Sequence, residues 1–564
     1  MSPEEPGQRG ISHFRLLRFP REGLLLALLS CLQAASVMAQ APAASETRAI
    51  IATARLPWSR WPDFPRYVDD VDRIYLARAD APAWLDHAGV SRQGRDALAQ
   101  VAEADTHGLD PRDYDVPTLD SLVDRLHGIT AQAPERLRFD LLLTVAFVRF
   151  IADLREGRTH PPPLSRSLPA APFDLAAAVS GAIAGDSIRG LANAVSPPFA
   201  QYRNLRRELT RYRALASDTA LRPVPVVRRL RPGDGYHGTD ALRARLSALG
   251  DFPVDTFATP PGQRYTGDLV EAVRRFQRRH GLSADGVVGP RTFAQLNAPV
   301  AGRVRQIELA LERLRWLPPV GRQSFVVVNI PAFQLFAFDS AGGSGIPSLS
   351  MRVIVGKALD TRTPVLVEQL RYLEFRPFWN VPRSILSQEI LPQLRRRPAD
   401  LREHGMELVG SRDRVLGDQV TPVVLDQLAR GELRVRQRPS PSNPLGQVKF
   451  VFPNAEAVYL HGTPDTALFG RQRRDFSHGC IRLEDPAGLA TWVLQDQSAW
   501  PADSVQAAMS GPVTRRAFLT RPMPTILFYT TAVARPEGGV TFYSDLYGHD
   551  RELDEALRAG PAPP

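Results

Sequence analysis

The spacing of apolar residues along the chain predicts helices in the first half and strands in the second. Between Val71 and Arg213 apolar residues recur at helical intervals, as in the stripe Leu137, Leu141, Leu142 and Val145. After Ser324 the period becomes two. Strands are predicted at 325–330, 334–338, 351–355, 372–375, 457–460 and 526–529. Helical spacing returns at 382–436 and at 548–557. We therefore predict a multidomain α+β chain with a mostly-β domain that is interrupted by a helical insertion.

Breaks in this pattern divide the chain into segments. Proline- and glycine-rich stretches separate the helical stripes and mark candidate boundaries. The predicted segments are a signal peptide at 1–39, a linker at 40–65, a helical scaffold domain at 66–222, a small three-helix domain at 223–299, a linker helix at 300–322, a mostly-β domain at 323–505 with its insertion at 383–436, and a C-terminal strand and helix at 506–564.

The N-terminus has the features of a secretory signal peptide. Arginines up to Arg21 precede the apolar run Leu24–Leu29, and Val37-Met38-Ala39 offers a small-residue cleavage site. The run is shorter than the roughly 20 apolar residues that a membrane span needs. Two alternatives stay open: a retained signal anchor, and a lipoprotein processing site that ends at Cys31. Each of these readings predicts an exported protein.

Composition narrows the class of protein. Hydrophobic residues make up 43% of the chain and charged residues 23%, which excludes a wholly disordered or collagen-like protein. A polytopic membrane protein is excluded because the only long apolar run lies near the N-terminus. The net charge of +10 is almost entirely arginine, because Lys357 and Lys449 are the only lysines. We read this mainly as compositional bias, with attraction to a polyanionic surface as the alternative. We expect no nucleic-acid partner and no integral membrane span after processing.

The candidate chemistry surrounds Cys480, the one cysteine of the predicted mature chain. A thiol is a good nucleophile only as the thiolate, so it needs a nearby base or positive charge. His461 ends a predicted strand and His478 lies two residues before the cysteine. Gly479 leaves main-chain N–H groups open for an oxyanion. Zinc ligation by the cysteine and the two histidines, or a buried inert cysteine, remain alternatives at this point.

The order of these residues resembles a known family. A histidine followed after about fifteen residues by Ser-His-Gly-Cys-Ile-Arg, 477–482, is similar to the signature of the L,D-transpeptidase catalytic domain of the YkuD type. The similarity extends over about 324–500 and implies that Cys480 is the nucleophile and His461 the general base. It further implies oxyanion or orienting roles for Gly479, His478, Gly462 and Ser477. Candidate substrate contacts are Arg482, Arg474 and Tyr459. Arg482 stands where the family more often has Asn. The resemblance implies neither a metal nor a cofactor.

Other segments extend the resemblance. The run AVRRFQRRHGLSADGVVGPRTFAQL, 272–296, resembles the three-helix peptidoglycan-binding module, although the stretch Pro260–Gly262 departs from its short form and an inert spacer is the alternative. Short motifs resemble the YcbB-like subgroup, whose members carry a helical lid over the catalytic domain. They are Trp379–Pro382, Arg436-Gln437, Asn443–Gly446 and Lys449-Phe450.

The resemblance implies a peptidoglycan L,D-transpeptidase that forms 3→3 cross-links through a cysteine thioester. Its expected partners are peptidoglycan stem peptides and glycan, with carbapenem β-lactams as inhibitors. Its expected location is periplasmic and wall-associated, with lipoprotein anchoring through Cys31 as a variant. An L,D-carboxypeptidase, an enzyme that attaches proteins to peptidoglycan, and a non-catalytic wall-anchoring protein are the alternatives.

Overall fold

A computed structural model describes residues 46–126, 133–159, 165–166, 172–252, 263–321, 323–340 and 345–560. The predicted signal peptide lies outside these residues, as does the stretch Pro260–Gly262. The chain forms two compact units, which are described separately. The first contains residues up to 98, 115–148 and 176–188, and the second contains 99–114, 149–175 and 189 onward.

The first unit is helical, as the sequence predicts. It consists of α2 (Val68–Leu76), the hairpin β1 (Leu85–Asp86) and β2 (Gly89–Val90), α4 (Val116–Leu126), α6 (Leu175–Ala184), and the first parts of α3 (Arg92–Ala102) and α5 (Ala133–Glu156). The buried carboxylate of Asp140 organises its core. It accepts hydrogen bonds from the Tyr75 hydroxyl at 2.7 Å and from the main-chain N–H of Trp84 at 2.8 Å. Burial raises the pKa of this carboxyl.

The second unit begins with helices and includes the predicted three-helix module. Its helices are α7 (Ile188–Val195), α8 (Ala200–Ser217), α9 (Thr239–Ala248), α10 (Asp268–Arg279), α11 (Pro290–Leu296) and α12 (Val300–Arg315). Gly250 has φ +80° just after α9, a left-handed conformation that ends the helix. In the module, the Tyr265 hydroxyl donates to the Gly286 carbonyl at 2.6 Å. The apolar stripes of α9 and α10 form its core.

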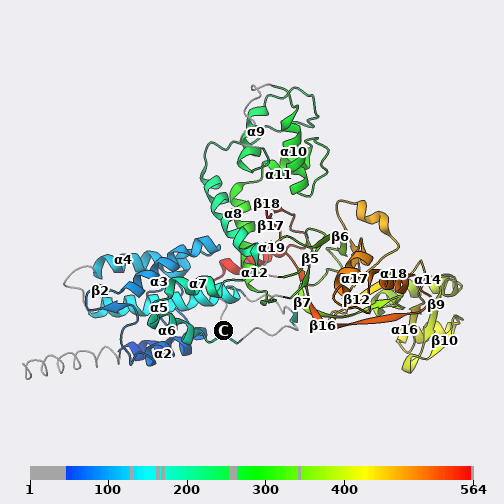
Figure 1. Cartoon of the computed structure of the whole chain (residues 1–564), viewed down its shortest axis with the longest axis horizontal. Coiled ribbons are helices and arrows are strands. Elements are labelled where there is room, and N and C mark those ends of the chain that lie inside the picture. Colours follow the sequence, from blue (N-terminus) through cyan, green and yellow to red (C-terminus); the bar gives the residue numbers. More distant parts are fainter. Residues whose placement is uncertain are drawn as a thin grey trace, which may run out of the picture. The chain divides into compact units, whose positions relative to one another are not determined.

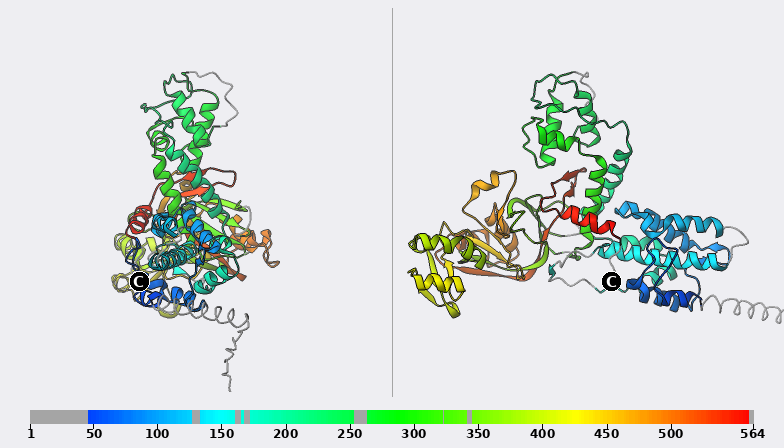
Figure 2. Two further views of the ribbon diagram at one scale, coloured as in Figure 1. Left: turned by 90° about the vertical axis from the view of Figure 1, so that its left-hand side faces the viewer. Right: turned by 180° about the vertical axis from the view of Figure 1, so that it is seen from behind.

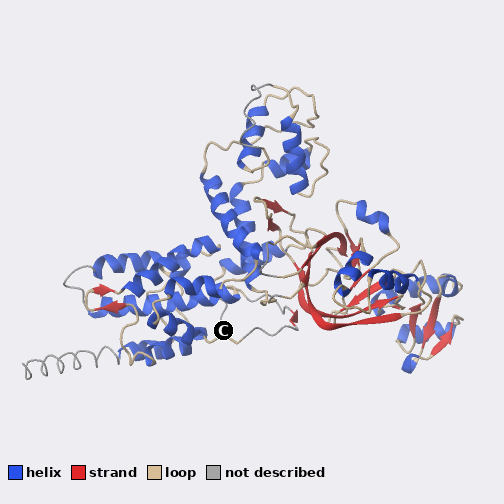
Figure 3. Ribbon diagram, viewed as in Figure 1, coloured by secondary structure: helices blue, strands red, loops and turns tan. Residues whose placement is uncertain are grey.

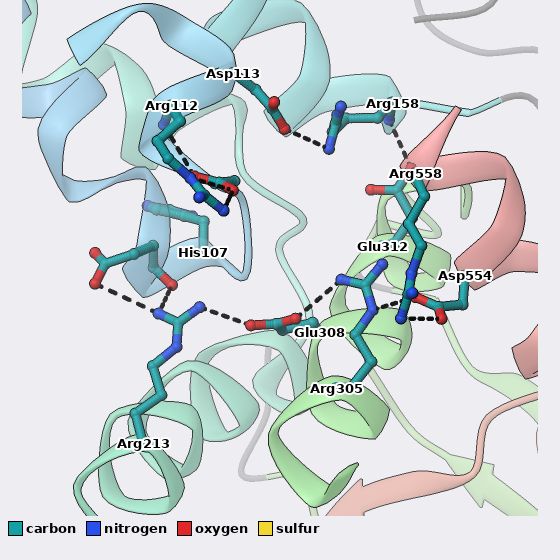
Figure 4. Close-up of polar contacts among 12 residues, drawn as sticks. His107, Arg112, Asp113, Arg158, Arg213, Arg305, Glu308, Glu312, Asp554 and Arg558 are labelled. Carbon is teal, nitrogen blue, oxygen red and sulfur yellow. Dashed lines mark hydrogen bonds and ion pairs between the residues drawn. The ribbon is translucent and has the colours of Figure 1, made fainter. Parts of the chain in front are cut away.

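Helix α12 is tied to its neighbours in the second unit by ion pairs (Figure 4). Arg305 contacts Asp554 at 2.6 Å and Glu308 at 2.9 Å, and Arg213 of α8 reaches Glu308 at 2.8 Å. Asp554 belongs to the closing helix α19 (His549–Arg558), which lies beside α12 (Figure 2). Some of the arginines thus form ion pairs within the protein. This agrees with reading the arginine excess as compositional bias.

The β region forms one sheet whose ends meet. Its order is β12-β13-β15-β6-β5-β4-β16-β7, and β12 also pairs with β7, which closes the ring of strands (Figures 1 and 3). The short β3 (Ser165–Arg166) adds to β7, and β14 pairs with β6. The strands are β4 (Phe325–Asn329), β5 (Gln334–Phe338), β6 (Leu349–Gly356), β7 (Leu366–Phe375), β12 (Val448–Val451), β13 (Leu460–His461), β14 (Asp475–Ser477), β15 (Ile481–Leu483) and β16 (Arg515–Phe528). Helices α17 (Pro486–Leu494) and α18 (Ala502–Ser510) share its apolar core.

The inserted segment differs from the purely helical lid that the sequence predicts. It contains helical turns α13 (Arg383–Ile385), the π-helical turn η4 (Leu386–Ile390), α14 (Leu391–Arg396), α15 (Asp400–Glu403) and α16 (Pro422–Arg430). It also contributes three strands, β10 (Val415–Gly417), β9 (Met406–Val409) and β11 (Arg434–Gln437), to a four-stranded sheet of order β10-β9-β11-β8. The fourth strand, β8 (Trp379–Asn380), lies just before the insertion. These strands are at most four residues long, which is too short for an alternation of apolar and polar residues to be recognised in the sequence. The insertion has its own apolar core.

Three predicted strands have clearly different bounds. The strand expected at 372–375 is the end of β7, which begins at Leu366. The strand expected at 526–529 is the end of β16, whose first residues Arg515–Arg521 are mostly exposed and contain only the short apolar run Ala517–Leu519. Of the strand expected at 457–460, only Leu460 belongs to β13. A small hairpin, β17 (Ala532–Ala534) and β18 (Val540–Phe542), follows β16 and was not predicted.

Candidate active site

Strand register brings the two central residues of the sequence motif to the same face of the sheet. In β13 and β15, which run parallel, Leu460 is opposite Ile481 and His461 is opposite Arg482. The Ile481 N–H donates to the Tyr459 carbonyl at 3.1 Å, which continues the pairing towards Cys480. Because side chains alternate between faces, Cys480 and His461 project from adjacent strand ends on one side. Their neighbours Leu460 and Ile481 are fully buried on the other side.

The imidazole of His461 is held as a neutral ring with one defined tautomer. Its Nδ1 lies 2.5 Å from the Gly462 carbonyl oxygen, which can only accept, so Nδ1 carries the proton. Burial lowers the pKa of His461 to about 3, and the positive charges of Arg482 and Lys449 add to this effect. Nε2 therefore keeps its lone pair at neutral pH, which is the state that a general base requires.

Cys480 is a free, partly exposed thiol. Its Sγ lies 4.0 Å from the Ala457 carbonyl oxygen. Burial raises the pKa of this thiol, whereas hydrogen bonds from Tyr459 and the charges of Lys449 and Arg482 act in the opposite direction. The resting site thus pairs a protonated thiol with a neutral imidazole, and activation requires transfer of the thiol proton.

The turn before Cys480 has a conformation that favours glycine. Gly479 has φ +114°, where a side chain would strain the backbone. The Ser477 hydroxyl donates to the Cys480 carbonyl at 2.6 Å and accepts from the Gly479 N–H at 3.2 Å. The Thr363 hydroxyl donates to the Gly479 carbonyl at 2.8 Å. These hydrogen bonds hold the turn in its conformation.

His478 points away from this turn and toward the insertion. Its Nε2 lies 2.7 Å from Oε1 of Glu389, which belongs to the π-helical turn η4. The two histidines of the motif are therefore in different environments, one buried beside a main-chain carbonyl and one linked to the insertion.

The three residues predicted to contact the substrate lie in different environments. Arg482 lies beside His461 and contacts Asp465 at 3.3 Å, and Tyr459 lies beside the thiol. Arg474 is 8% exposed, and its guanidinium donates to the carbonyls of Arg471, Val353 and Phe333 at 2.7, 3.2 and 3.1 Å. These bonds give Arg474 a structural function in the loop.

Three residues near the candidate site were not among the predicted site residues. Glu389 contacts His478, and Lys449 is the cross-strand partner of His461 in β12. Gly446, at φ +62°, packs directly against Gly462, whose carbonyl orients the imidazole. The Asn-Pro-Leu-Gly and Lys-Phe motifs that contain two of these residues were visible, but only the register connects them to His461.

The zinc alternative is not supported by the arrangement of the side chains. Within the described ranges, no three His, Cys, Asp or Glu side chains gather as possible metal ligands. His478 is instead engaged with Glu389, and His461 with its own neighbouring carbonyl.

A thiol and a neutral histidine on adjacent strand ends define a site suited to acyl transfer through a cysteine. Residues 323–513 match the family described as L,D-transpeptidase catalytic domain. Residues 238–296 match a putative peptidoglycan binding domain, and 69–209 match a scaffold domain. The chain therefore carries an L,D-transpeptidase catalytic domain of the YkuD type and a peptidoglycan-binding domain, as the resemblance implied.

The chain is also similar to a curated protein, "Putative L,D-transpeptidase", of Haemophilus influenzae. The two are 31% identical over 255 residues, which are 45% of this chain and 49% of the relative. The chain thus spans about half the length of the curated relative it matches. No helix among the described residues is long and apolar enough to cross a membrane.

Proposed function

We propose that the protein is a peptidoglycan L,D-transpeptidase that forms 3→3 cross-links through a thioester on Cys480. The observation that carries this proposal is the register of β13 and β15, which sets a partly exposed thiol beside a buried neutral imidazole on one face. The family match of residues 323–513 supports the class of reaction.

In the first step, the Cys480 thiol transfers its proton to Nε2 of His461 and its sulfur attacks a donor stem peptide. The attacked carbonyl is that of the third residue, a diamino acid, and the main-chain N–H of Cys480 stabilises the oxyanion, because the Gly479 N–H donates to the Ser477 hydroxyl. The carbon–nitrogen bond to the terminal D-alanine breaks, and the imidazolium returns the proton to the leaving amine. A thioester and free D-alanine result.

In the second step, the side-chain amine of another stem attacks the thioester. His461 accepts the proton of that amine, the carbon–sulfur bond breaks, and the thiol is restored. Covalent catalysis divides one difficult amide exchange into two easier acyl transfers. With water in place of the amine, the same site would release a tripeptide, as an L,D-carboxypeptidase does.

The remaining segments suit a substrate in the cell wall. Residues 238–296 match a domain described as peptidoglycan binding, and the N-terminal sequence has the features of an export signal. We propose a periplasmic, wall-associated location, with peptidoglycan stems and glycan as partners and carbapenems as inhibitors that acylate Cys480. Anchoring through Cys31 is a variant of this location.

The test uses the purified full chain with disaccharide-tetrapeptide, and mass spectrometry of the products. We expect 3→3 cross-linked dimer and free D-alanine from the native protein, and a single acyl adduct after mixing with a carbapenem. Cys480→Ser should form neither the cross-linked dimer nor the carbapenem adduct, with a nearly unchanged melting temperature. Cys31→Ser is the matched control and should form both. Tripeptide without dimer would indicate the carboxypeptidase, and an unreactive Cys480 would indicate a non-catalytic anchoring protein.

A further inference from the structure

Lys449 is an unusual residue for this chain and lies beside the reactive thiol. Of the 70 lysines and arginines, 68 are arginine, and Lys449 is one of two lysines. It is opposite His461 across β12 and β13, so the two side chains share the catalytic face. On its other side, Lys449 is opposite Glu374 of β7.

The ammonium group of Lys449 is held in place by a ring. Its Nζ lies 3.8 Å from the centre of the Tyr459 ring, a distance typical of a cation–π contact. Tyr459 is the residue whose main-chain and side-chain hydrogen bonds act on the Cys480 sulfur. The ring thereby fixes a positive charge next to the nucleophile.

Competing charges around Lys449 are few and already engaged. The Glu374 carboxylate faces it from β7 but contacts Arg516 of β16 at 2.8 Å. The other neighbours are Cys480, the neutral His461 and Arg482, which is opposite His461 and contacts Asp465. Among the described residues, no hydrogen bond or ion pair joins the Lys449 ammonium to a carboxylate. Burial lowers the pKa of Lys449, and the Cys480 and Glu374 charges oppose that change. The Arg516 charge also lowers the pKa of Lys449.

The neutral imidazole explains why such a charge matters. In a thiolate–imidazolium pair the histidine itself stabilises the sulfur anion. His461 is buried beside two cations and has a pKa of about 3, so it does not provide that charge in the resting site. In the resting site the positive charge that favours ionisation of the thiol therefore comes from other residues, and Lys449 and Arg482 are the cations that act on the Cys480 sulfur.

We propose that Lys449 is a positioning residue whose ammonium, held on the Tyr459 ring, stabilises the Cys480 thiolate. The inference rests on the proposed function, because it takes Cys480 as the nucleophile. An ammonium is compact and fits over one ring, whereas the planar, forked guanidinium of arginine has a different shape. This difference gives a reason for a lysine in an arginine-rich chain.

The experiment measures iodoacetamide alkylation of Cys480 against pH in the full chain, with the modified peptide quantified by mass spectrometry. Lys449→Met removes the charge and keeps the length. We expect the midpoint of the profile to rise by about one pH unit, the usual effect of losing a nearby opposite charge. Alkylation at pH 7 should slow only about three- to fourfold, because a thiolate of higher pKa is intrinsically more nucleophilic.

Two further variants separate charge from structure. Lys357→Met makes the same substitution at the other lysine, which is exposed, and should leave the profile unchanged. Lys449→Arg restores a positive charge and should recover at least half of the shift. A Lys449→Met profile that superimposes on the native one, an equal shift in Lys357→Met, or no recovery in Lys449→Arg would each overturn the proposal.

The same measurement distinguishes this proposal from the proposed function. Thiol titration requires no peptidoglycan, so it reports on Lys449 even if no cross-link forms. Conversely, cross-linking that survives in Cys480→Ser would overturn the proposed function, whatever the alkylation profiles show. A melting temperature for each variant checks that a shift does not arise from partial unfolding.

Discussion

Nε2 of His478 lies 2.7 Å from Oε1 of Glu389, so the turn that presents Cys480 is joined to the inserted segment by one side-chain contact. Glu389 lies in the π-helical turn η4, and such turns are rare and frequent at functional sites. The insertion is therefore in contact with the catalytic turn, which gives a physical basis for proposing that residues 383–436 act as a lid.

The first prediction concerns removal of that lid. The ends of the insertion are cross-strand partners, since Gln437 pairs with Trp379, so a short Gly/Ser loop can replace residues 383–436. The shortened protein should remain folded because the insertion has a core of its own. It should acylate more slowly and lose selectivity for the amine acceptor over water, because lids exclude water and complete sites.

The measurement is the ratio of cross-linked dimer to hydrolysed tripeptide, by mass spectrometry. Glu389→Gln should shift this ratio in the same direction by a smaller amount. Glu403→Gln is the matched control, since that lid carboxylate pairs with Arg397 and should leave the ratio unchanged. An identical ratio and rate after the deletion would mean that the segment is no lid.

The second prediction assigns the general base. His461→Ala should lower the rate of carbapenem acylation by about 10²–10⁴-fold, the usual loss when a well-positioned base is removed. His478→Ala should lower this rate less. The His478 ring contacts Glu389 of the insertion, whereas the His461 ring lies beside the Gly462 carbonyl. Acylation rates from intact-mass time courses compare the two, and a larger loss in His478→Ala would reverse the assignment.

The third prediction concerns Gly446, which the catalytic motif does not include. A Cβ at this position would lie 2.7 Å from the Gly462 carbonyl carbon and from the Thr463 nitrogen, and φ of +62° adds strain. Gly446→Ala should therefore displace the carbonyl that holds Nδ1 of His461. We expect a loss of acylation of tenfold or more, with a smaller loss of stability than of rate.

Gly470 provides the control for this change. No atom lies within 4 Å of a Cβ built there, and Gly470→Ala should keep native acylation. An unchanged acylation rate in Gly446→Ala would show that acylation does not depend on the position of the Gly462 carbonyl. Melting temperatures of both variants separate a local displacement from general unfolding.

The sequence alone predicted the architecture because the long periodic stripes of α5, α8 and α10 and the buried strands β4 to β6 leave strong patterns. It also singled out Cys480 and His461 as the proposed nucleophile and base, since the motif is local, and these roles stay predictions. It missed the strands of the lid because Met406–Val409 and Arg434–Gln437 are short and paired only through tertiary contacts. Glu389 lies 89 residues from His478, and no pattern within one segment links them.

The side-chain directions of two arginines could not be predicted from the sequence either. Arg474 and Arg482 look equivalent in the sequence as positive charges that flank the thiol. In the structure Arg474 precedes β14 and donates to three carbonyls, whereas Arg482 belongs to β15 and lies opposite His461. Side-chain direction in a loop depends on hydrogen bonds that only the folded chain makes.

The last prediction concerns stability in acid and involves a different histidine. His107 is 4% exposed, and its Nδ1 lies 3.1 Å from the Tyr202 hydroxyl. Burial lowers its pKa to about 2, and the nearby charges of Arg206 and Arg315 reinforce this effect. Between about pH 6.5 and pH 2 the unfolded chain binds a proton that the folded chain does not, so the free energy of unfolding falls as the pH falls.

One such group contributes a slope of up to about 1.4 kcal/mol per pH unit in that range. His107→Gln keeps a neutral hydrogen-bonding side chain and removes the titration. Its melting temperature should be lower than the native value at pH 7, but should fall less steeply between pH 6.5 and 4. The same substitution at exposed His87 should leave the steepness unchanged. Differential scanning calorimetry at half-unit steps measures these slopes, and parallel curves for native protein and His107→Gln would contradict the assignment, because they would mean that His107 takes up its proton equally in the folded and unfolded chain.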